Sequence, residues 1–370
     1  MAGIRSFTAE SSAAVSPAKG CSGQRIVNLR FKAMTEVLRY GVIGTGMMGC
    51  EHIRNIHKLP DSEIVAIADP DEKSRQFGAL ACAELDMQVE VYEDYREMLS
   101  SGAIDAVVIA SPNFTHIDVM RDVFKTDLHV MLEKPMCTTL AACDEVVEAT
   151  ASHAGVVWVG LEYRYMAPIA ALLGKLREGA VGDLKMFSIR EHRHPFLPKV
   201  GDWNRFSRNT GGTLVEKCCH FFDLMNLATA KQPLRVYASG GQAVNHLDER
   251  YAGETPDILD HAYVTIDYED GVKATLDLCM FAESSRNEQE ICAVGDGGKL
   301  ECFVPGSSMV VGTRKYRDFE EIAIPVDPRV EHAGFHHGAS YLEHLDFADA
   351  IRQGTPPLVD VRDGLASVAL

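Results

Sequence analysis

The stretch GGTLVEKCCHFFDL, residues 211–224, places an acid, two thiols and a histidine close together along the chain. Glu216, Cys218, Cys219 and His220 could bind a metal ion, form a redox pair or move protons. Two adjacent thiols with one histidine lack the Cys-x-x-Cys spacing of zinc sites, and neighbouring cysteines are poorly placed for an unstrained disulfide. We therefore expect no metal site here and favour acid–base chemistry.

The apolar residues of GGTLVEKCCHFFDLMNL, residues 211–227, recur at helical spacing, so we expect one helix. Glu216 and His220, four residues apart, would share a face of that helix, with Asp223 a turn further on. An acid beside an imidazole fixes its tautomer and favours its protonated form. This predicts a histidine base oriented by Glu216 that accepts a proton from an alcohol. Without another catalytic group, a buried structural helix would be the default interpretation.

A glycine-rich motif points to a cofactor. GTGMMG follows the apolar strand YGVI at once and leads into the helical CEHIRNIHKL, which is the context that a dinucleotide-binding motif requires. Gly44 would make the tight turn, Gly46 would let the backbone approach a pyrophosphate, and Gly49 would allow close helix packing. The alternative, a plain turn with a solvated Asp69, leaves the register of strand, helix and acid unexplained.

Asp69 closes the next apolar strand, IVAIA, where a carboxylate can bond the adenosine ribose hydroxyls. A carboxylate there would repel a 2′-phosphate, and Pro70 and Asp71 follow it instead of an arginine. NAD is therefore favoured over NADP. Lys73 and Arg75 lie near enough to keep this preference moderate.

Strands and helices keep alternating after Asp69, which predicts a doubly wound parallel sheet. The loops SPNFTH and EKPM follow two apolar strands and would emerge at the carboxyl edge of that sheet, where such folds bind ligands. Lys134 in EKPM could donate to the oxygen of a carbinol or carbonyl, and Pro135 could fix the turn through a cis bond; the alternative is a surface turn with a solvated lysine. The predicted cofactor-binding residues are Gly44, Gly46, Met47, Met48, Gly49, Asp69, Ser111, Pro112, Asn113, His116 and Glu133.

Taken together, GVIGTGMMG, ASPNFTHIDVM, HVMLEKPM, the YRY at 163–165 with Pro168 beyond it, and GGTLVEKCCHFFDL resemble the Gfo/Idh/MocA family, which includes glucose-fructose oxidoreductase and inositol dehydrogenase. The resemblance spans nearly everything from Tyr40 onward. It implies that Lys134 and His220 are catalytic. Glu216 stands where the family usually has aspartate, and Cys218 stands where a glycine is common, which would narrow the substrate site.

The second half of the chain alternates apolar and polar residues and contains the turns EDG and GDGG, which predict two hairpins. The expected fold class is α/β: an N-terminal Rossmann domain followed by an α+β domain on an open-faced, largely antiparallel sheet. The resemblance implies that the open face serves homo-oligomerisation. We expect a tail over 1–36, the NAD-binding domain over 37–158 and the substrate-binding domain over 159–370.

A polar, aromatic stretch, EHRHPFLPKVGDWNRFSRN, precedes the proposed catalytic helix and is a candidate lining for a substrate site. The alternative is a surface excursion in which Trp203 is a packing anchor. His336 and His337 in GFHHGASY could also reach a polyol, although such a pair is more often solvated. The predicted substrate-binding residues are Lys134, Tyr163, Arg164, His194, Trp203, Asn204 and His220.

Composition narrows the possible partners. The 53 acids exceed the 36 bases by 17, which disfavours nucleic acid and anionic membranes. The ten cysteines are scattered and suggest an intracellular, cytoplasmic protein with reduced thiols. The basic, serine-rich residues before Met34 resemble an organelle-targeting segment, and VRDGLASVAL at the end reads as a helix cut off in mid-course.

These observations favour an NAD-dependent oxidoreductase acting on a secondary alcohol of a sugar or cyclitol, with Lys134 polarising the oxygen, His220 as base and Glu216 orienting it. One alternative is an NAD-retaining glycosidase that oxidises a ring hydroxyl transiently to permit elimination. A second alternative is a nucleotide-sensing regulator without catalysis.

Overall fold

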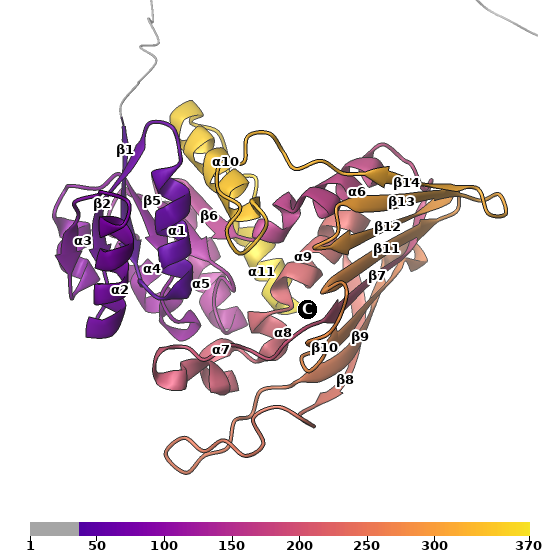
Figure 1. The fold of residues 1–370 in the computed structure, drawn as a ribbon, viewed down its shortest axis with the longest axis horizontal. Helices are drawn as coiled ribbons and strands as arrows, with labels where there is room; N and C mark the ends of the chain where they lie inside the picture. Colours follow the sequence, from indigo (N-terminus) through magenta and orange to yellow (C-terminus); the bar gives the residue numbers. More distant parts are fainter. Residues whose placement is uncertain (1–36) are drawn as a thin grey trace, which may run out of the picture. The chain divides into compact units, whose positions relative to one another are not determined.

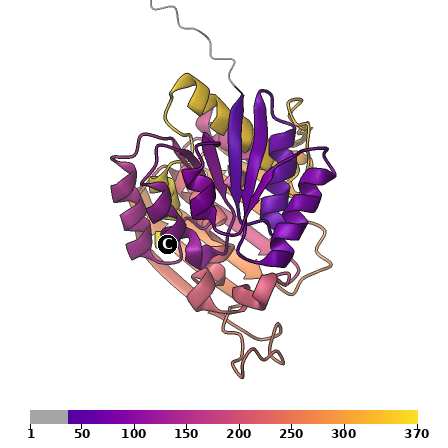
Figure 2. The same ribbon diagram turned by 90° about the vertical axis from the view of Figure 1, so that its left-hand side faces the viewer.

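The computed structural model describes residues 37–370, so the predicted tail lies outside the described residues. The first part of the chain forms the predicted parallel sheet in the order β3-β2-β1-β4-β5-β6, with helices on both faces (Figures 1 and 2). Its elements are β1 (Leu38–Ile43), α1 (Met47–His57), β2 (Ser62–Ala68), α2 (Glu72–Ala83), β3 (Glu90–Tyr92), α3 (Tyr95–Ser100), β4 (Ala106–Ile109), η1 (Asn113–Thr115), α4 (His116–Val123), β5 (His129–Glu133), α5 (Leu140–Thr150) and β6 (Val157–Gly160).

Burial explains why these strands read as apolar runs. Every residue of β4 and β6 is buried, as expected for parallel strands covered on both faces. The strand order reverses between β1 and β4. In such sheets, ligands bind outside the carboxyl ends of the strands at this reversal. The glycine motif after β1 and the EKP turn after β5 both lie at this edge.

The second part forms an eight-stranded sheet in the order β14-β13-β12-β11-β7-β10-β9-β8, with neighbours antiparallel except for β7 and β10. This confirms the predicted mixed, largely antiparallel sheet. Its elements are η2 (Glu162–Tyr165), α6 (Ala167–Arg177), β7 (Leu184–His192), η3 (Val200–Arg205), α7 (Ser207–Thr210), α8 (Thr213–Glu216), α9 (Cys219–Thr229), β8 (Pro233–Gly241), β9 (His261–Tyr268), η4 (Glu269–Gly271), β10 (Lys273–Cys279), β11 (Gln289–Gly295), β12 (Gly298–Val304), β13 (Ser308–Thr313) and β14 (Phe319–Ala323), followed by α10 (Ala339–Gln353) and α11 (Val361–Ala369).

One face of this sheet is covered and the other is open. Ala274, Leu276 and Leu278 are buried with the helices, whereas Lys273 on the alternate face is exposed, as the sequence pattern predicted. The EDG and GDGG turns join β9 to β10 and β11 to β12, so both predicted hairpins are confirmed.

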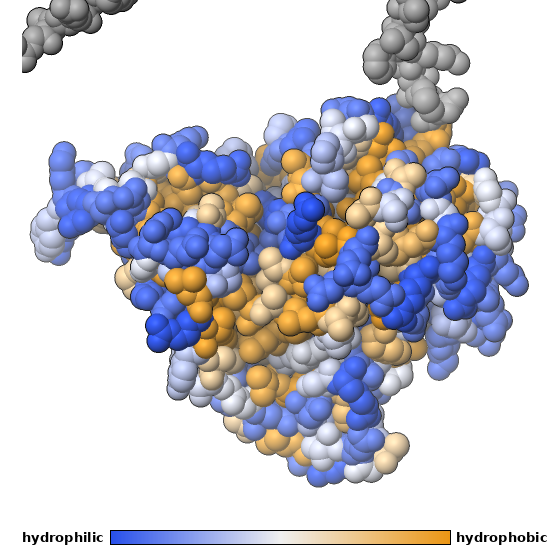
Figure 3. Space-filling view, turned by 180° about the vertical axis from the view of Figure 1, so that it is seen from behind, coloured by the Kyte–Doolittle hydropathy of each residue, from blue (hydrophilic) through white to orange (hydrophobic). Residues whose placement is uncertain are grey.

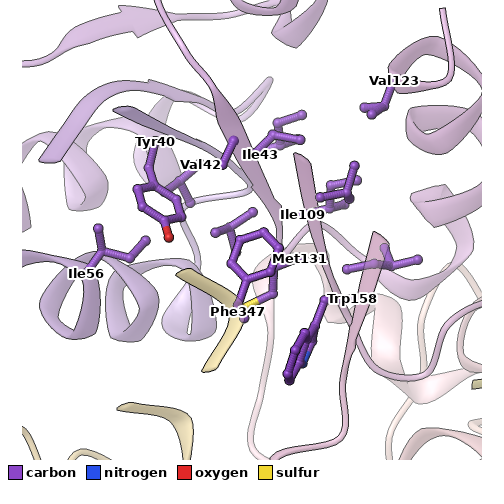
Figure 4. Close-up of a cluster of buried hydrophobic side chains, with 14 of the residues drawn as sticks. Tyr40, Val42, Ile43, Ile56, Ile109, Val123, Met131, Trp158 and Phe347 are labelled. Atoms are coloured by element: carbon purple, nitrogen blue, oxygen red, sulfur yellow. The ribbon is translucent and has the colours of Figure 1, made fainter. Parts of the chain in front are cut away.

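The chain returns to the first sheet after residue 338. Phe347 of α10 is fully buried and lies beside Trp158 of β6, with ring centroids 6.1 Å apart (Figure 4). The Trp158 indole donates to Glu343 at 3.0 Å, and Val159 donates its amide to the Val359 carbonyl at 3.2 Å. The last two helices therefore belong to the core of the parallel sheet, although they follow the second sheet in sequence.

Among residues 37–370, no helix is long and apolar enough to cross a membrane. Figure 3 views the side opposite to Figure 1 and shows hydrophobic residues gathered centrally, with hydrophilic residues around them. On the second sheet, the exposed large apolar side chains include Met186, Tyr237 and Tyr263.

Because α10 packs against β6, we expect its buried side chains to stabilise the core of the parallel sheet. Phe347→Ala should lower the free energy of unfolding by about 3–5 kcal/mol, because it removes a fully buried ring between α10 and β6. The matched variant Phe319→Ala, at a phenylalanine that is 65% exposed, should change it by less than about 0.5 kcal/mol. Urea unfolding followed by circular dichroism measures both, and equal effects would show that α10 is not part of this core.

Candidate active site

The glycine motif forms a cradle that fits a dinucleotide. Gly44 has φ of 87°, and a Cβ on Gly49 would lie 1.9 Å from the Gly44 carbonyl oxygen, so side chains are excluded at both positions. A Cβ on Gly46 would meet nothing within 4 Å, which leaves open space beside the first turn of α1. A pyrophosphate can occupy that space against the amide groups of the helix N-terminus.

Backbone amide groups hold the side chain of Asp69, which directly follows β2. Its carboxylate accepts from the Thr45 amide at 2.8 Å and from the Asp71 amide at 2.9 Å. Burial raises its pKa although these amide bonds oppose the rise. Arg75 donates to the carbonyls of residues 69 and 70 at 2.7 and 2.8 Å. The guanidinium nearest to Asp69 is thus already engaged, which agrees with the predicted preference for NAD.

The other predicted cofactor residues divide into two groups. Met47 is 46% exposed at the start of α1, and the Asn113 side-chain nitrogen is buried without a hydrogen-bond partner among the described residues. His116, by contrast, is fully buried, and its two ring nitrogens face the carbonyls of Pro135 and Ser111 at 2.9 and 3.1 Å. His116 therefore cannot face a cofactor; it joins the loop after β4 to the EKP turn.

The EKP turn gains its neighbours from strand pairing. In the parallel pairing of β5 with β6, Glu133 is opposite Gly160, so the residues that follow the two strands lie side by side. Lys134 follows β5 with a cis bond to Pro135, and Glu162 begins η2 after β6. Burial is the largest influence on Lys134 and lowers its pKa, but Glu162, Cys219 and Glu133 together outweigh burial, and the pKa of this lysine is raised. Its ammonium has no hydrogen bond or ion pair with any residue in 37–370.

Glu133 supports the turn from beneath. One carboxylate oxygen accepts from the Lys134 amide at 3.0 Å, and the other lies 2.8 Å from Nε2 of His52. The second ring nitrogen of His52 lies 2.8 Å from His344 of α10. Burial opposes ionisation, but the His52 contact prevails and lowers the pKa of Glu133 to about 2. Glu133 is buried, so its observed role is to fix the lysine turn.

The predicted single helix over 211–227 is wrong. It is divided into α8, which ends at Glu216, and α9, which starts at Cys219. Because the helix is interrupted, Glu216 and His220 do not form the expected pair, and Asp223 bonds Arg164 instead. The acid beside His220 is Glu162, whose Oε1 lies 3.5 Å from its Nε2.

His220 is held rigidly and lacks a partner on one side. Its ring stacks on Tyr163 with centroids 4.1 Å apart and planes 8° from parallel. Burial and the charge of Lys134 lower its pKa well below the usual value, so the ring is neutral. Nε2 faces Glu162, while Nδ1 is buried without a hydrogen-bond partner among the described residues. A neutral imidazole has a nitrogen that can accept a proton, and the charge of Lys134 makes this ring a weaker base than an ordinary histidine.

Glu216 remains part of the charged cluster in another way. Burial raises its pKa, with Lys199 and Lys134 opposing that rise, and one carboxylate oxygen has no hydrogen-bond partner within 37–370. Lys199, from the loop before α7, lies over Trp203 with its ammonium 5.0 Å from the ring centroid. Glu216, Lys134 and Lys199 interact by charge but share no hydrogen bond, so their hydrogen-bonding capacity is not used within this cluster.

A buried ion pair closes the site on the side of the second sheet. Lys217 donates to the Tyr163 hydroxyl at 2.6 Å and lies 3.0 Å from Glu191 of β7. Gln289 of β11 donates to the same carboxylate at 2.6 Å. These contacts fix the ring on which His220 stacks.

Three residues predicted to bind substrate are engaged elsewhere. Arg164 bonds Asp223 through two nitrogens and also lies 3.2 Å from Asp363. Asn204 is fully buried and donates to the Leu197 carbonyl at 3.0 Å. His194 follows β7; Arg193 donates to its Nε2 at 3.1 Å and its Nδ1 lies 3.7 Å from Glu288, and it has no hydrogen bond or ion pair with His220. Local sequence could not show these tertiary partners.

Trp203 lies at the border of the cofactor site. Its ring meets Phe114 of η1 edge-on, with centroids 6.3 Å apart. The tryptophan therefore packs against the loop after β4, while Lys199 covers its face. Its place agrees with a site-lining role as well as with the packing role.

The loop 324–338 adds a second histidine. His336 Nε2 lies 3.4 Å from Glu162 Oε1, and its Nδ1 lies 3.2 Å from the Ser340 hydroxyl. Glu51 of α1 accepts from the Phe335 amide at 3.2 Å, and a Cβ on Gly334 would lie 1.6 Å from that carboxylate. Only glycine allows this approach, which ties the loop to the helix of the glycine motif.

Sequence reasoning overlooked Glu162, Lys199 and Lys217. Glu162 immediately precedes the YRY motif, and Lys217 lies inside the stretch that was analysed for His220. An acidic residue two positions beyond a buried strand of the parallel sheet was the available signal for Glu162. No comparable signal singled out either lysine.

Comparison with known proteins decides the family. An oxidoreductase family model for an NAD-binding Rossmann fold matches residues 38–161, and the model for the C-terminal α/β domain of the same family matches residues 174–370. The chain belongs to the Gfo/Idh/MocA oxidoreductase family. Its Rossmann domain is accordingly an NAD-binding domain, which confirms the predicted cofactor.

Several relatives in the Gfo/Idh/MocA family are named as dehydrogenases of inositols or sugars. The myo-inositol 2-dehydrogenase of Thermotoga maritima is 25% identical over 335 residues, covering 90% of this chain and 94% of that protein. The inositol 2-dehydrogenase of Pseudarthrobacter chlorophenolicus is 30% identical over 258 residues, covering 68% and 69%. A levoglucosan dehydrogenase solved with NADH and levoglucosan has the same fold, with a TM-score of 0.77, 19% identity and coverage of 90% and 94%.

Asp69 provides a test of the cofactor site. Asp69→Ala should weaken NAD binding about tenfold or more, because charge-assisted hydrogen bonds to the ribose are lost, and should narrow the preference over NADP. Titration of both cofactors followed by fluorescence measures this. Glu72→Ala, which removes an exposed acid nearby, should leave both affinities unchanged. Tighter binding of NADPH than NADH by the wild type would contradict this assignment.

Proposed function

We propose that the protein oxidises a secondary alcohol of a sugar or cyclitol, with NAD as hydride acceptor and Lys134 and His220 as the catalytic residues. The observation that carries this proposal is the position of two unpartnered groups in one cluster. Within residues 37–370, the Lys134 ammonium and the His220 Nδ1 have no hydrogen-bond partner, and the lysine charge influences the histidine pKa. They lie at the carboxyl edge of the sheet, as does the glycine cradle.

The polar groups around this pair support a polyol as substrate. Glu162 and Glu216 offer carboxylate oxygens without hydrogen bonds among the described residues, and Lys199 offers an ammonium. Buried polar groups without partners are costly, and vicinal hydroxyls can both donate and accept. Sugars and cyclitols carry such hydroxyls. The names of the relatives, two inositol 2-dehydrogenases and a levoglucosan dehydrogenase, agree with this class.

The residues divide the chemistry between them. Lys134 would donate to the reacting oxygen and stabilise its developing negative charge. His220 Nδ1 would accept the hydroxyl proton, while Tyr163 holds the ring in place by stacking. Glu162 would orient the ring through Nε2, the part that the sequence assigned to Glu216. Glu216 would instead accept a hydrogen bond from a neighbouring hydroxyl. NAD⁺, held by the glycine motif and Asp69, would supply the hydride acceptor for the carbinol carbon.

The reaction class and the substrate class can be tested by measuring NADH formation with a panel of inositols, aldoses and glycosides. Release of NADH in step with substrate consumption is expected of a dehydrogenase. Conversion of a glycoside without net NADH would instead support the transient-oxidation glycosidase, and absence of any conversion would favour a nucleotide-sensing regulator.

The catalytic assignments predict a split in kinetic parameters. Lys134→Ala and His220→Ala should each lower kcat by about a hundredfold or more, because each acts mainly in the transition state. NAD affinity should change little. Glu216→Gln should act chiefly on KM, because it holds a hydroxyl that does not react. Steady-state kinetics with fluorescence titration of NAD measures these effects.

Two results would contradict these roles. Unchanged turnover in Lys134→Ala would remove the catalytic role of the EKP turn. A loss of kcat in Glu216→Gln equal to that of His220→Ala would return the orienting role to Glu216.

We further propose that the protein is a homo-oligomer joined through the open face of the second sheet. Met186 and Tyr263 are 57% and 66% exposed on that face and would be covered by a second copy. Light scattering should therefore show a dimer or tetramer for the wild type and a smaller species for Tyr263→Glu. Tyr316→Glu, at an exposed loop tyrosine, is the control. A monomeric wild type would contradict the proposal.

A further inference from the structure

Oxidation of an alcohol in this site leaves one proton to be removed. His220 is 1% exposed, so a proton accepted at Nδ1 cannot pass directly to water. The inference drawn from this rests on the proposed alcohol oxidation. Other groups must therefore connect His220 with solvent.

Two groups follow His220 in line. Glu162 is also 1% exposed, and one oxygen, Oε1, lies 3.5 Å from His220 Nε2 and 3.4 Å from His336 Nε2. Neither Glu162 oxygen has a hydrogen-bond partner among the described residues, so nothing competes for that oxygen. His336 differs from both because 20% of its side-chain surface is exposed. The order from buried to exposed is His220, Glu162, His336.

We propose that Glu162 and His336 carry the proton released by alcohol oxidation from His220 to solvent. The hydroxyl proton bonds to His220 Nδ1 as the hydride, with its electron pair, leaves the carbinol carbon for NAD⁺. The proton on His220 Nε2 passes to Glu162 Oε1, and Glu162 gives its proton to His336 Nε2. His336 releases the proton on Nδ1 to water. The net charge of the site is then restored, but both rings carry their proton on the other nitrogen, so each ring must return to its first tautomer before the next turnover.

The surroundings of the relay set the protonation states of Glu162 and His336. Burial, with a contribution from Glu133, raises the pKa of Glu162 to about 8, while Lys134 and Lys217 oppose the rise. A carboxyl with such a pKa gains and loses a proton readily near neutral pH. Burial and the charges of Lys134 and Lys217 lower the pKa of His336 to about 3, with Glu133 opposing and His52 adding to the effect. His336 is thus neutral, and because its pKa is lower than that of Glu162 it must release a proton from Nδ1 as it receives one at Nε2.

The chain supplies a matched control. His337 follows His336 directly, is exposed and makes no hydrogen bond or ion pair with residues 37–370. His336→Asn and His337→Asn therefore make the same chemical change inside and outside the proposed relay. Asparagine also tolerates the positive φ of 55° at His337.

The test measures turnover of the full chain with NAD and the best substrate of the panel, at low buffer concentration and with added imidazole. His336→Asn should lower kcat at least about tenfold at low buffer, and imidazole should restore it by carrying the proton instead. The deuterium isotope effect of a carbon-deuterated substrate should shrink, because proton exit becomes limiting. His337→Asn should behave as the wild type. Equal behaviour of the two variants, or a loss in His336→Asn that imidazole does not restore, would overturn the proposal.

A second readout needs neither cofactor nor turnover. In ¹⁵N-histidine NMR spectra, Glu162→Gln should shift the ring signals of His220 and His336 and leave that of His337 in place. Unshifted signals would overturn the relay even if a variant of His336 fails to fold. A wild type that oxidises no alcohol would instead show that the proposed function has failed.

Discussion

The parallel pairing of β5 with β6 is the constraint on which the proposed site depends. Because Glu133 lies opposite Gly160, the chain leaves both strands at the same edge, and Lys134 comes to lie near Glu162. Tyr163, the next residue, then presents its ring for His220 to stack on. A shift of this register by one residue would turn alternate side chains to opposite faces and separate these groups.

The site concentrates buried charge that the protein alone does not neutralise. Glu133 is bonded to His52, and Glu191 is paired with Lys217. By contrast, the side-chain carboxylates of Glu162 and Glu216 and the ammonium groups of Lys134 and Lys199 make no hydrogen bonds within residues 37–370. Such groups are costly to bury unless a ligand completes their hydrogen bonds. The cluster is thus held by structural ion pairs at its rim and left incomplete at its centre, as a polyol site would require.

Sequence reasoning succeeded where local order determines structure. The glycine motif, Asp69, the EKP turn and both hairpins are set by neighbours along the chain, and the structure contains them. It failed where a partner comes from a distant element. Nothing near Arg164 in sequence reveals Asp223. Asn204 bonds a carbonyl only seven residues away, but in an irregular loop without a periodic pattern, and helical spacing did not show the interruption after Glu216. The packing of α10 against the first sheet could not be predicted either, because its partners in β6 lie far away in sequence.

The central claim is that the reacting alcohol lies between Lys134 and His220. A crystal structure of the ternary complex with NADH and the best substrate of the panel tests it directly. The reacting oxygen should lie within hydrogen-bonding distance of both Lys134 Nζ and His220 Nδ1, with Glu162 on the opposite side of the imidazole. A reacting hydroxyl held by other groups, with His220 Nδ1 still unpartnered, would contradict the account.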